Sequence, residues 1–160
     1  MTIKVGDRIP NVTIYHMTEN GPAPISTNDI FKGRKVVLFA LPGAYTPTCS
    51  AKHLPGFVAK AGEIKGKGVD TIACLSVNDA FVMGSWGKEQ NVGDKVLMLA
   101  DGSGELTKAL GLELDLISRG MGVRSDRYAM IVDDGVVKTL NREAPGAFEV
   151  SSAEKVLQAL

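Results

Sequence analysis

The sequence predicts an α/β fold in which a central mixed β-sheet is flanked by helices on both faces. Three short apolar runs rich in β-forming residues, at 35–41, 69–77 and 95–100, have the composition of strands buried on both faces. Each run is followed by a stretch in which a helix is expected. Because strand–helix–strand units imply right-handed crossovers, this alternation predicts a mostly parallel sheet. A hairpin pattern at 127–140 adds an antiparallel part.

The N-terminal part of the chain carries a weak strand pattern and a turn pattern before the first buried strand. Residues 11–16 (NVTIYH) alternate weakly between polar and apolar side chains, which predicts a strand. Residues 19–24 (ENGPAP) contain Asn-Gly and two prolines, which predict a turn. The run KVVLFAL (35–41) then predicts the first buried strand, and the Pro-Gly pair after it ends that strand.

The segment after this strand predicts a helix that contains an unusual proline. Thr46 is a suitable N-cap, and Pro47 would occupy the first helical position, where proline is favoured. Apolar residues spaced three and four apart from 51 to 61 define a buried face. Pro55 removes a backbone donor inside the helix, so we expect a kink there. The sequence GKG (66–68) ends the helix.

The second half of the chain continues the alternation of strands and helices. We expect a strand at 69–77, then a helix capped by Asp79 and running to 90, then a strand at 95–100. A further helix is opened by Ser103-Gly104. A hairpin at 127–140 turns at Asp133-Asp134-Gly135, and the capping box Ser151-x-x-Glu154 begins a C-terminal helix. The polar, glycine-containing segment 118–126 is expected to be a loop. This order of elements is typical of a thioredoxin-like fold.

Composition and charge limit the classes of function. The 160 residues suit one domain, so we expect a single domain spanning 1–160. The formal net charge is zero and no long basic run occurs, which gives nucleic-acid binding little support. No stretch approaches the roughly 20 apolar residues that cross a bilayer, and the N-terminus does not resemble a signal peptide. We therefore expect a cytoplasmic protein with no membrane partner.

The two cysteines, Cys49 and Cys74, are the candidate reactive groups. Cys49 follows a buried strand and falls in the first turn of the next helix, at the edge of the sheet where reacting groups collect. Unpaired N–H groups and the helix dipole at that position favour a thiolate, which is the nucleophilic form. An inert buried thiol is the structural alternative. Neither the cysteines nor the two histidines have zinc-ligand spacing, and no metal is expected.

The surroundings of Cys49 decide between these alternatives. Pro42, Thr46 and Cys49 match the PxxxTxxC motif of the peroxiredoxins, and the longer string ALPGAYTPTCS resembles their type II branch, also called type 5. The strings VDTIACLSVNDAFVMGSWGK and RYAMIVDDGVVKTLN also resemble that branch in sequence and position. The resemblance covers nearly the whole chain and implies a thioredoxin-like fold.

The resemblance implies a role for each motif residue. Cys49 would be the peroxidatic cysteine, whose thiolate attacks a peroxide oxygen and becomes a sulfenic acid. Thr46 would place its hydroxyl near the sulfur and the peroxide, a role compatible with capping the helix. Pro42 would shield the pocket from water as well as end the strand.

The family also requires an arginine from a distant strand near the thiolate. Arg127 matches because it opens the strand RYAMIVDDG, whereas Arg119 and Arg124 lie in the polar loop and are expected to be solvated. The guanidinium of Arg127 would hold the sulfur ionised and stabilise charge that develops on the peroxide. An exposed charge at a strand end is the alternative role for Arg127.

Cys74 lies in the middle of a predicted strand and has two interpretations. It is either a small core residue or, as the resemblance allows, a resolving cysteine that condenses with the Cys49 sulfenic acid. A disulfide needs Cα atoms within about 7 Å, so the first helical turn would have to unwind. In the bystander interpretation, glutathione with glutaredoxin, or thioredoxin, reduces Cys49 directly. The sequence leaves both open.

The function that follows is a thiol-dependent peroxidase that reduces hydrogen peroxide and alkyl hydroperoxides with an external thiol and no metal, haem or flavin. The alternative is a peroxide-sensing relay that oxidises a partner protein by disulfide exchange. A thioredoxin-type oxidoreductase is disfavoured because CxxC is absent. His53, at helical spacing from Cys49, could form a Cys–His hydrolase pair, but no orienting Asn or Asp is evident.

The resemblance further implies a homodimer that forms near the active site. Ala44, Tyr45 and Phe81 are the residues that we expect at that interface. Trp86 and Met83, together with Phe81, are interpreted as packing or dimer-surface residues rather than as a cofactor site.

Overall fold

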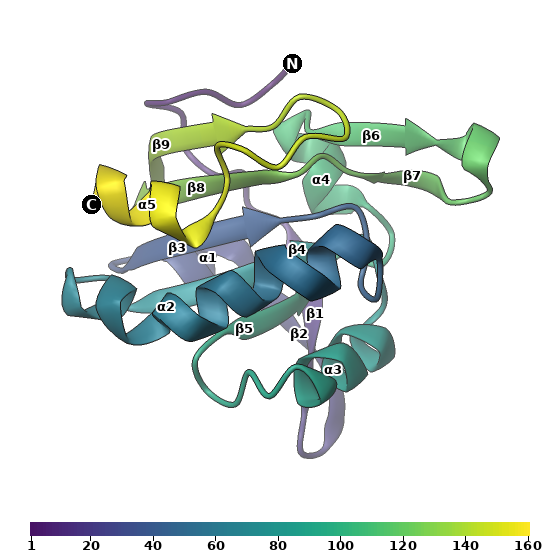
Figure 1. The fold of residues 1–160 in the computed structure, drawn as a ribbon, viewed down its shortest axis with the longest axis horizontal. Coiled ribbons are helices and arrows are strands. Elements are labelled where there is room, and N and C mark those ends of the chain that lie inside the picture. The colour runs from purple at the N-terminus through teal and green to yellow at the C-terminus, as the bar shows by residue number, and fades with distance from the viewer.

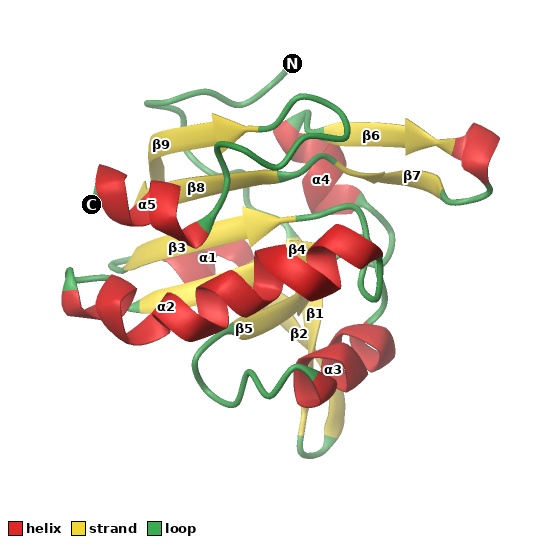
Figure 2. Cartoon of the chain, viewed as in Figure 1, coloured by secondary structure: helices red, strands yellow, loops and turns green.

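The computed structural model describes residues 1–160, which form one seven-stranded sheet with helices on both faces and a separate two-stranded arm (Figures 1 and 2). The strands are β1 (Thr13–Thr18), β2 (Gly21–Ser26), β3 (Lys35–Ala40), β4 (Thr71–Ser76), β5 (Leu97–Ala100), β6 (Glu113–Leu116), β7 (Gly122–Ser125), β8 (Tyr128–Asp133) and β9 (Val136–Arg142). The α-helices are α1 (Thr27–Phe31), α2 (Leu54–Gly66), α3 (Ala80–Glu89), α4 (Glu105–Leu110) and α5 (Ala153–Ala159).

The strand order in the large sheet is β2-β1-β5-β4-β3-β8-β9. The three predicted buried strands, β3, β4 and β5, are parallel neighbours at its centre. Every other pairing in this sheet is antiparallel, because the β1–β2 hairpin joins β5 on one side and the β8–β9 hairpin joins β3 on the other. The mixed thioredoxin-like sheet is therefore confirmed, while the expectation of a mostly parallel sheet is wrong.

The central strands are apolar throughout because they separate two cores. In β3 the side chains of Val37 and Phe39 enter one core, and those of Val36 and Leu38 enter the other. Helices α2, α3 and α5 cover the first face, and α1 and α4 cover the second (Figure 1). None of the helices combines the length and the apolar composition that a bilayer-spanning segment needs.

The predicted turn at 19–24 is wrong for most of its length. Only the residues before Gly21 form the turn, and Gly21–Ser26 is the edge strand β2. Pro22 and Pro24 pair in register with Met17 and Tyr15 of β1. Proline has no backbone donor, but an edge strand tolerates it because one row of its backbone groups needs no partner strand.

A second difference is the arm formed by β6 and β7: β7 lies in the segment 118–126, where a loop was expected, and no element was expected at β6. Glu113 pairs with Ser125 and Leu116 with Gly122, and the arm extends away from the large sheet (Figures 1 and 2). Each strand is only four residues long and buries no hydrophobic side chain, so the alternation of Glu113–Leu116 (ELDL) is too short to predict a strand by itself.

Two of the predicted local signals are confirmed and one is wrong. Asp79 caps α3 by accepting a hydrogen bond from the Val82 N–H at 2.8 Å. The β8–β9 hairpin turns at Asp134 and Gly135, both at positive φ, as a two-residue hairpin loop requires. The cap of α5 is Ser152, one residue after the predicted serine, and it accepts from the Lys155 N–H.

Candidate active site

Cys49 lies at the start of the helical segment that follows β3. The Ser50 N–H donates to the Thr46 carbonyl at 2.9 Å, which is the first helical hydrogen bond. The turn Cys49–His53 is a π-helix in which the Leu54 N–H bonds the Cys49 carbonyl. Pro55 favours this wider turn, because its ring clashes with the carbonyl four residues earlier and its nitrogen cannot bond it, and the expected kink itself stays a prediction.

The sulfur of Cys49 is buried and faces a guanidinium. Its residue is 0% exposed, and Nη2 of Arg127 donates to Sγ at 3.1 Å. Arg127 directly precedes β8, and the pairing of Tyr128 with Ala40 brings it to the carboxyl end of β3. Of the three candidate arginines, Arg127 is therefore the one in contact with Cys49, across a separation of 78 residues.

His53 connects to the same guanidinium rather than to the sulfur. Its Nδ1 lies 2.8 Å from Nη1 of Arg127, and its Nε2 lies 3.0 Å from the carbonyl oxygen of Ser151. Because arginine only donates, Nδ1 accepts and Nε2–H donates, which defines the neutral tautomer. Burial, aided by the positive charge of Arg127, lowers the pKa of His53 to about 3. Both ring nitrogens are occupied, which removes the hydrolase alternative.

The loop from Pro42 to Thr46 forms the wall beside the sulfur. The Thr46 hydroxyl donates to the Gly43 carbonyl at 2.8 Å, and the Ala44 N–H donates to Oδ1 of Asn78 at 2.9 Å. Tyr45 has φ of 66°, a conformation that is uncommon for residues other than glycine. The predicted side-chain cap by Thr46 is therefore replaced by a hydrogen bond that closes the loop on itself.

Arg124 takes part in this loop, which contradicts the expectation that it is solvated. It is partly buried, with Nε donating to the Met121 carbonyl at 2.8 Å and Nη1 donating to the Pro42 carbonyl at 3.2 Å. A Cβ atom at Gly43 would lie 2.8 Å from Nη1 of Arg124, so glycine is needed for this approach. Arg119, in contrast, is exposed as expected. No sequence signal revealed the arm that delivers Arg124.

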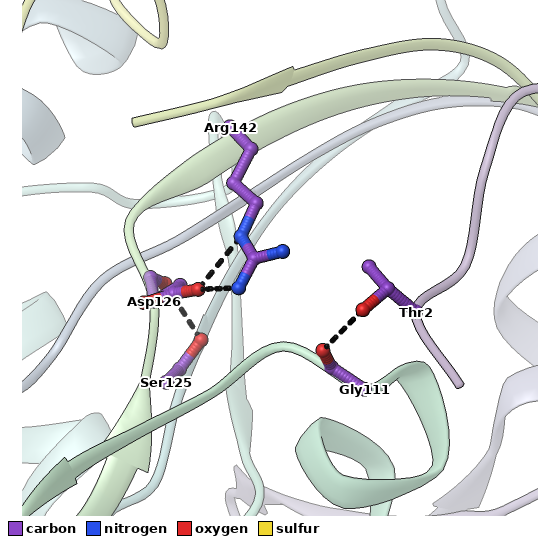
Figure 3. A network of polar contacts seen from close by, with 5 residues as sticks. All are labelled: Thr2, Gly111, Ser125, Asp126 and Arg142. Atoms are coloured by element: carbon purple, nitrogen blue, oxygen red, sulfur yellow. Dashed lines mark hydrogen bonds and ion pairs between the residues drawn. The ribbon is translucent and has the colours of Figure 1, made fainter. Parts of the chain in front are cut away.

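An ion pair holds the start of β8 in place. Nε of Arg142, at the end of β9, donates to Oδ2 of Asp126 at 2.8 Å, and the Ser125 hydroxyl donates to the Asp126 carbonyl (Figure 3). The hydroxyl of Thr2 donates to the Gly111 carbonyl in the same view. Because Asp126 directly precedes Arg127, this pair constrains the backbone from which the guanidinium extends.

Cys74 lies inside β4, between Phe39 of β3 and Met98 of β5. Both cysteines are free, and both belong to the core cluster between the sheet and α2. Burial, aided by the neighbouring Cys49, raises the pKa of the Cys74 thiol well above its usual value.

A small cavity lies beside Arg127. Its volume is about 120 Å³, and its lining includes Pro42, Thr48, Leu114 and Glu143. Arg127 connects this cavity to the sulfur, since Cys49 itself is not part of the lining. The chain brings together no group of three or more His, Cys, Asp or Glu side chains that could hold a metal ion.

These features define a buried cysteine thiol in contact with an arginine, on a thioredoxin-like fold. A family model described as Redoxin matches residues 4–157. Peroxiredoxin-2E, chloroplastic, from Arabidopsis thaliana is 53% identical over 163 aligned residues, which cover 99% of this chain and 70% of that protein. Peroxiredoxin-2B from the same plant is 53% identical over 99% of this chain and 98% of its own length.

Solved structures agree with the sequence relatives. Reduced Prx3 from Vibrio vulnificus in complex with hydrogen peroxide matches with a TM-score of 0.95 and 55% identity, covering 99% of both chains. Peroxiredoxin 5 from Alvinella pompejana matches with a TM-score of 0.86 and 40% identity, covering 98% of this chain and 97% of its own. The chain belongs to the redoxin family and is a peroxiredoxin, a peroxidase that uses cysteine thiols and no prosthetic group.

Proposed function

We propose that Cys49 is the peroxidatic residue of this enzyme. Its thiolate attacks one oxygen of hydrogen peroxide or an alkyl hydroperoxide, so that an S–O bond forms as the O–O bond breaks. The sulfur becomes a sulfenic acid, and the departing oxygen takes up a proton and leaves as water or an alcohol. The observation that carries this proposal is the 3.1 Å contact of Arg127 Nη2 with a fully buried Sγ.

The other residues have supporting roles in this step. Arg127 stabilises both the thiolate and the charge on the departing oxygen, because a guanidinium stays charged and donates in a fixed fork. Thr46 offers its hydroxyl oxygen at the loop beside Cys49, and Pro42 closes that loop against water. The Arg124 contact with the Pro42 carbonyl supports this role, because it holds the proline in place.

An external thiol recycles the sulfenic acid in this proposal. The thiol attacks the sulfenic sulfur and releases water, and a second thiol reduces the resulting mixed disulfide. Glutathione with glutaredoxin, or thioredoxin, has the required chemistry. Cys74 is disfavoured as the resolving residue because it is fully buried and its pKa is raised, both of which keep its thiol protonated and shielded.

Two further proposals concern assembly and location. Tyr45, in the active-site loop, and Phe81, in the first turn of α3, are 47% and 66% exposed, which supports a homodimer interface that includes them. Ala44 is partly buried, and Trp86 and Met83 are fully buried packing residues. The single domain at 1–160 and the cytoplasmic location remain predictions from the sequence.

The decisive test compares Cys49→Ser with Cys74→Ser in a peroxide-consumption assay with glutathione and glutaredoxin, and again with thioredoxin. We expect Cys49→Ser to lose all turnover and Cys74→Ser to retain it with at least one donor. Mass mapping after one equivalent of peroxide identifies the oxidised species. Turnover by Cys49→Ser would contradict the peroxidatic assignment, and a Cys49–Cys74 disulfide would contradict external resolution.

The sensing relay is separated from the peroxidase by rate. A relay clears peroxide slowly and accumulates a mixed disulfide with one partner protein. We expect instead sustained turnover with low-molecular-weight peroxides, because Arg127, which contacts Cys49, also lines a cavity of only about 120 Å³.

A further inference from the structure

A buried carboxylate that lines the small cavity beside Arg127 has no role in the reaction described so far. Glu143 follows β9 and is 6% exposed. Its Oε2 accepts hydrogen bonds from the N–H groups of Glu149, Val150 and Ser151, each at 2.8 Å, and from the Ser151 hydroxyl at 2.7 Å. These bonds lower the pKa of Glu143, against the effect of its burial. The carboxylate of Glu143 therefore holds the backbone from 148 to 151 in one conformation.

The segment that Glu143 organises contacts the arginine site through two residues. The Ser151 carbonyl accepts from Nε2–H of His53, whose Nδ1 accepts from Arg127. The ring of Phe148 lies 5.1 Å from the His53 ring, and the guanidinium of Arg127 lies 5.8 Å from the Phe148 ring centre. Both distances are in the range of aromatic and cation–π contacts.

The guanidinium needs this support because its orientation decides what it offers to the sulfur. Nη2 faces Sγ of Cys49 while Nη1 faces His53, so a rotation of the guanidinium plane would break both contacts. A carboxylate in direct contact with Arg127 would also hold it, but its negative charge would oppose the thiolate. Here a neutral imidazole makes the contact, and the anion lies one step further away.

We propose that Glu143 is a positioning residue for the peroxidase reaction. By binding the segment 148–151 it places the Ser151 carbonyl and the Phe148 ring against His53 and Arg127, and so directs Nη2 of Arg127 at Cys49. This inference rests on the proposed roles of Cys49 and Arg127. The backbone agrees with it, since the Glu143 N–H donates to the Arg127 carbonyl at 2.9 Å.

The test measures two rates in Glu143→Gln. One is the second-order rate of Cys49 oxidation by hydrogen peroxide, monitored through the fluorescence of Trp86. The indole N–H of Trp86 donates to the hydroxyl of Ser50, the residue after Cys49, at 3.1 Å. The other is the rate of alkylation of Cys49 by iodoacetamide as a function of pH, which reports the thiolate. We expect the peroxide rate to fall about tenfold and the alkylation profile to move to higher pH, because a charge-assisted anchor is weakened.

Asp101→Asn is the matched control. Asp101 is a 2% exposed carboxylate that accepts from the N–H groups of Leu106 and Thr107 on the opposite face of the sheet. We expect this variant to lower the unfolding temperature while both rates stay within about twofold of the parent, because it does not touch the arginine site. If Glu143→Gln loses stability in the same way but keeps both rates, Glu143 is only structural and the proposal fails.

Two further variants keep the test informative. Ser151→Ala removes one of the four bonds to Glu143, and we expect a smaller change in the same direction, about two- to threefold. In an Arg127→Lys background, Glu143→Gln should add less than about twofold, since its target has been removed. A full tenfold effect in that background would overturn the proposal. Peroxide consumption by Cys49→Ser would instead overturn the assignment of Cys49, whatever Glu143 does.

Discussion

The two cysteines of this chain share a core but differ in what faces them. Both are 0% exposed and pack in the cluster between the sheet and α2. Cys74 lies between two neighbouring strands, where burial raises the pKa of its thiol. Cys49 lies where β3 has ended, and Arg127 donates to its sulfur. Burial alone raises the pKa of a thiol, and under the proposed mechanism reactivity follows where a fixed positive charge is brought to the sulfur.

The largest expected effect comes from removing that charge. We expect Arg127→Gln to lower kcat/KM for hydrogen peroxide by about 100- to 1000-fold, because it removes a preorganised cationic donor at the sulfur. Peroxide consumption at saturating thiol donor measures this. Arg119→Gln is the control, since Arg119 is exposed on the arm and should keep full activity. Equal losses of kcat/KM in Arg127→Gln and Arg119→Gln would show that the Arg127 contact is not what distinguishes Cys49 from Cys74.

The next effect is a dependence of stability on pH that originates at the Cys49 site. The pKa of His53 is lowered from 6.5 to about 3 in the folded protein, so the unfolded chain binds a proton first as pH falls. Its contribution to stability is therefore present above pH 6.5 and is lost between pH 6.5 and about 3.

Urea unfolding measures this difference. Between pH 7 and 5 we expect the parent to lose about 2 kcal/mol through this group, and His53→Gln to lose much less. The same slope in both proteins would show that His53 is not the titrating group. Cys74 should contribute nothing to this slope, because its thiol is protonated throughout that range.

A smaller effect is expected at Cys74, and it concerns stability rather than catalysis. Cys74→Ser places a hydroxyl in the core between Phe39 and Met98, which should cost about 1–3 kcal/mol in unfolding free energy. Cys74→Ala, which buries no polar group, should cost less. Urea denaturation measures both. A stable Cys74→Ser variant that has lost turnover with every thiol donor would show that Cys74 takes part in the cycle.

The smallest effect is expected from the loop beside Cys49. Arg124→Gln removes the contact between Nη1 and the Pro42 carbonyl, so we expect kcat/KM for peroxide to fall by about two- to tenfold. Gly43→Ala should act in the same direction, because its Cβ would meet Nη1 of Arg124. Steady-state assays check both. Unchanged activity in both variants would limit the contribution of this loop to closing the site.

Much of the fold could be predicted because its signals are local. The three central strands are apolar on both faces, and the β8–β9 turn carries Asp134-Gly135 at positive φ. The strands of the β6–β7 arm and the edge strand β2 could not be predicted, because the arm strands are largely exposed and β2 contains Pro22 and Pro24. Their patterns carry no burial signal, and only pairing with another strand makes them strands.

The candidate site divides in the same way. Pro42, Thr46 and Cys49 lie within eight consecutive residues, so their spacing alone places them at one strand–helix junction. Arg127 was found only through a resemblance, and Arg124 was misjudged as solvated. The link through His53 to Ser151 spans 98 residues and leaves no periodic trace in the sequence.

The sequence by itself determined the layered α/β architecture and the position of Cys49 at the end of a buried strand, because these depend on hydrophobic periodicity and on residues close in the chain. Only the tertiary structure decided which guanidinium reaches the sulfur, how deeply the second thiol is buried, and which C-terminal residues pack against His53 and Arg127. Those outcomes depend on strand register and on which groups lose water together. Strand register and shared burial both arise from contacts between residues that are far apart in the sequence.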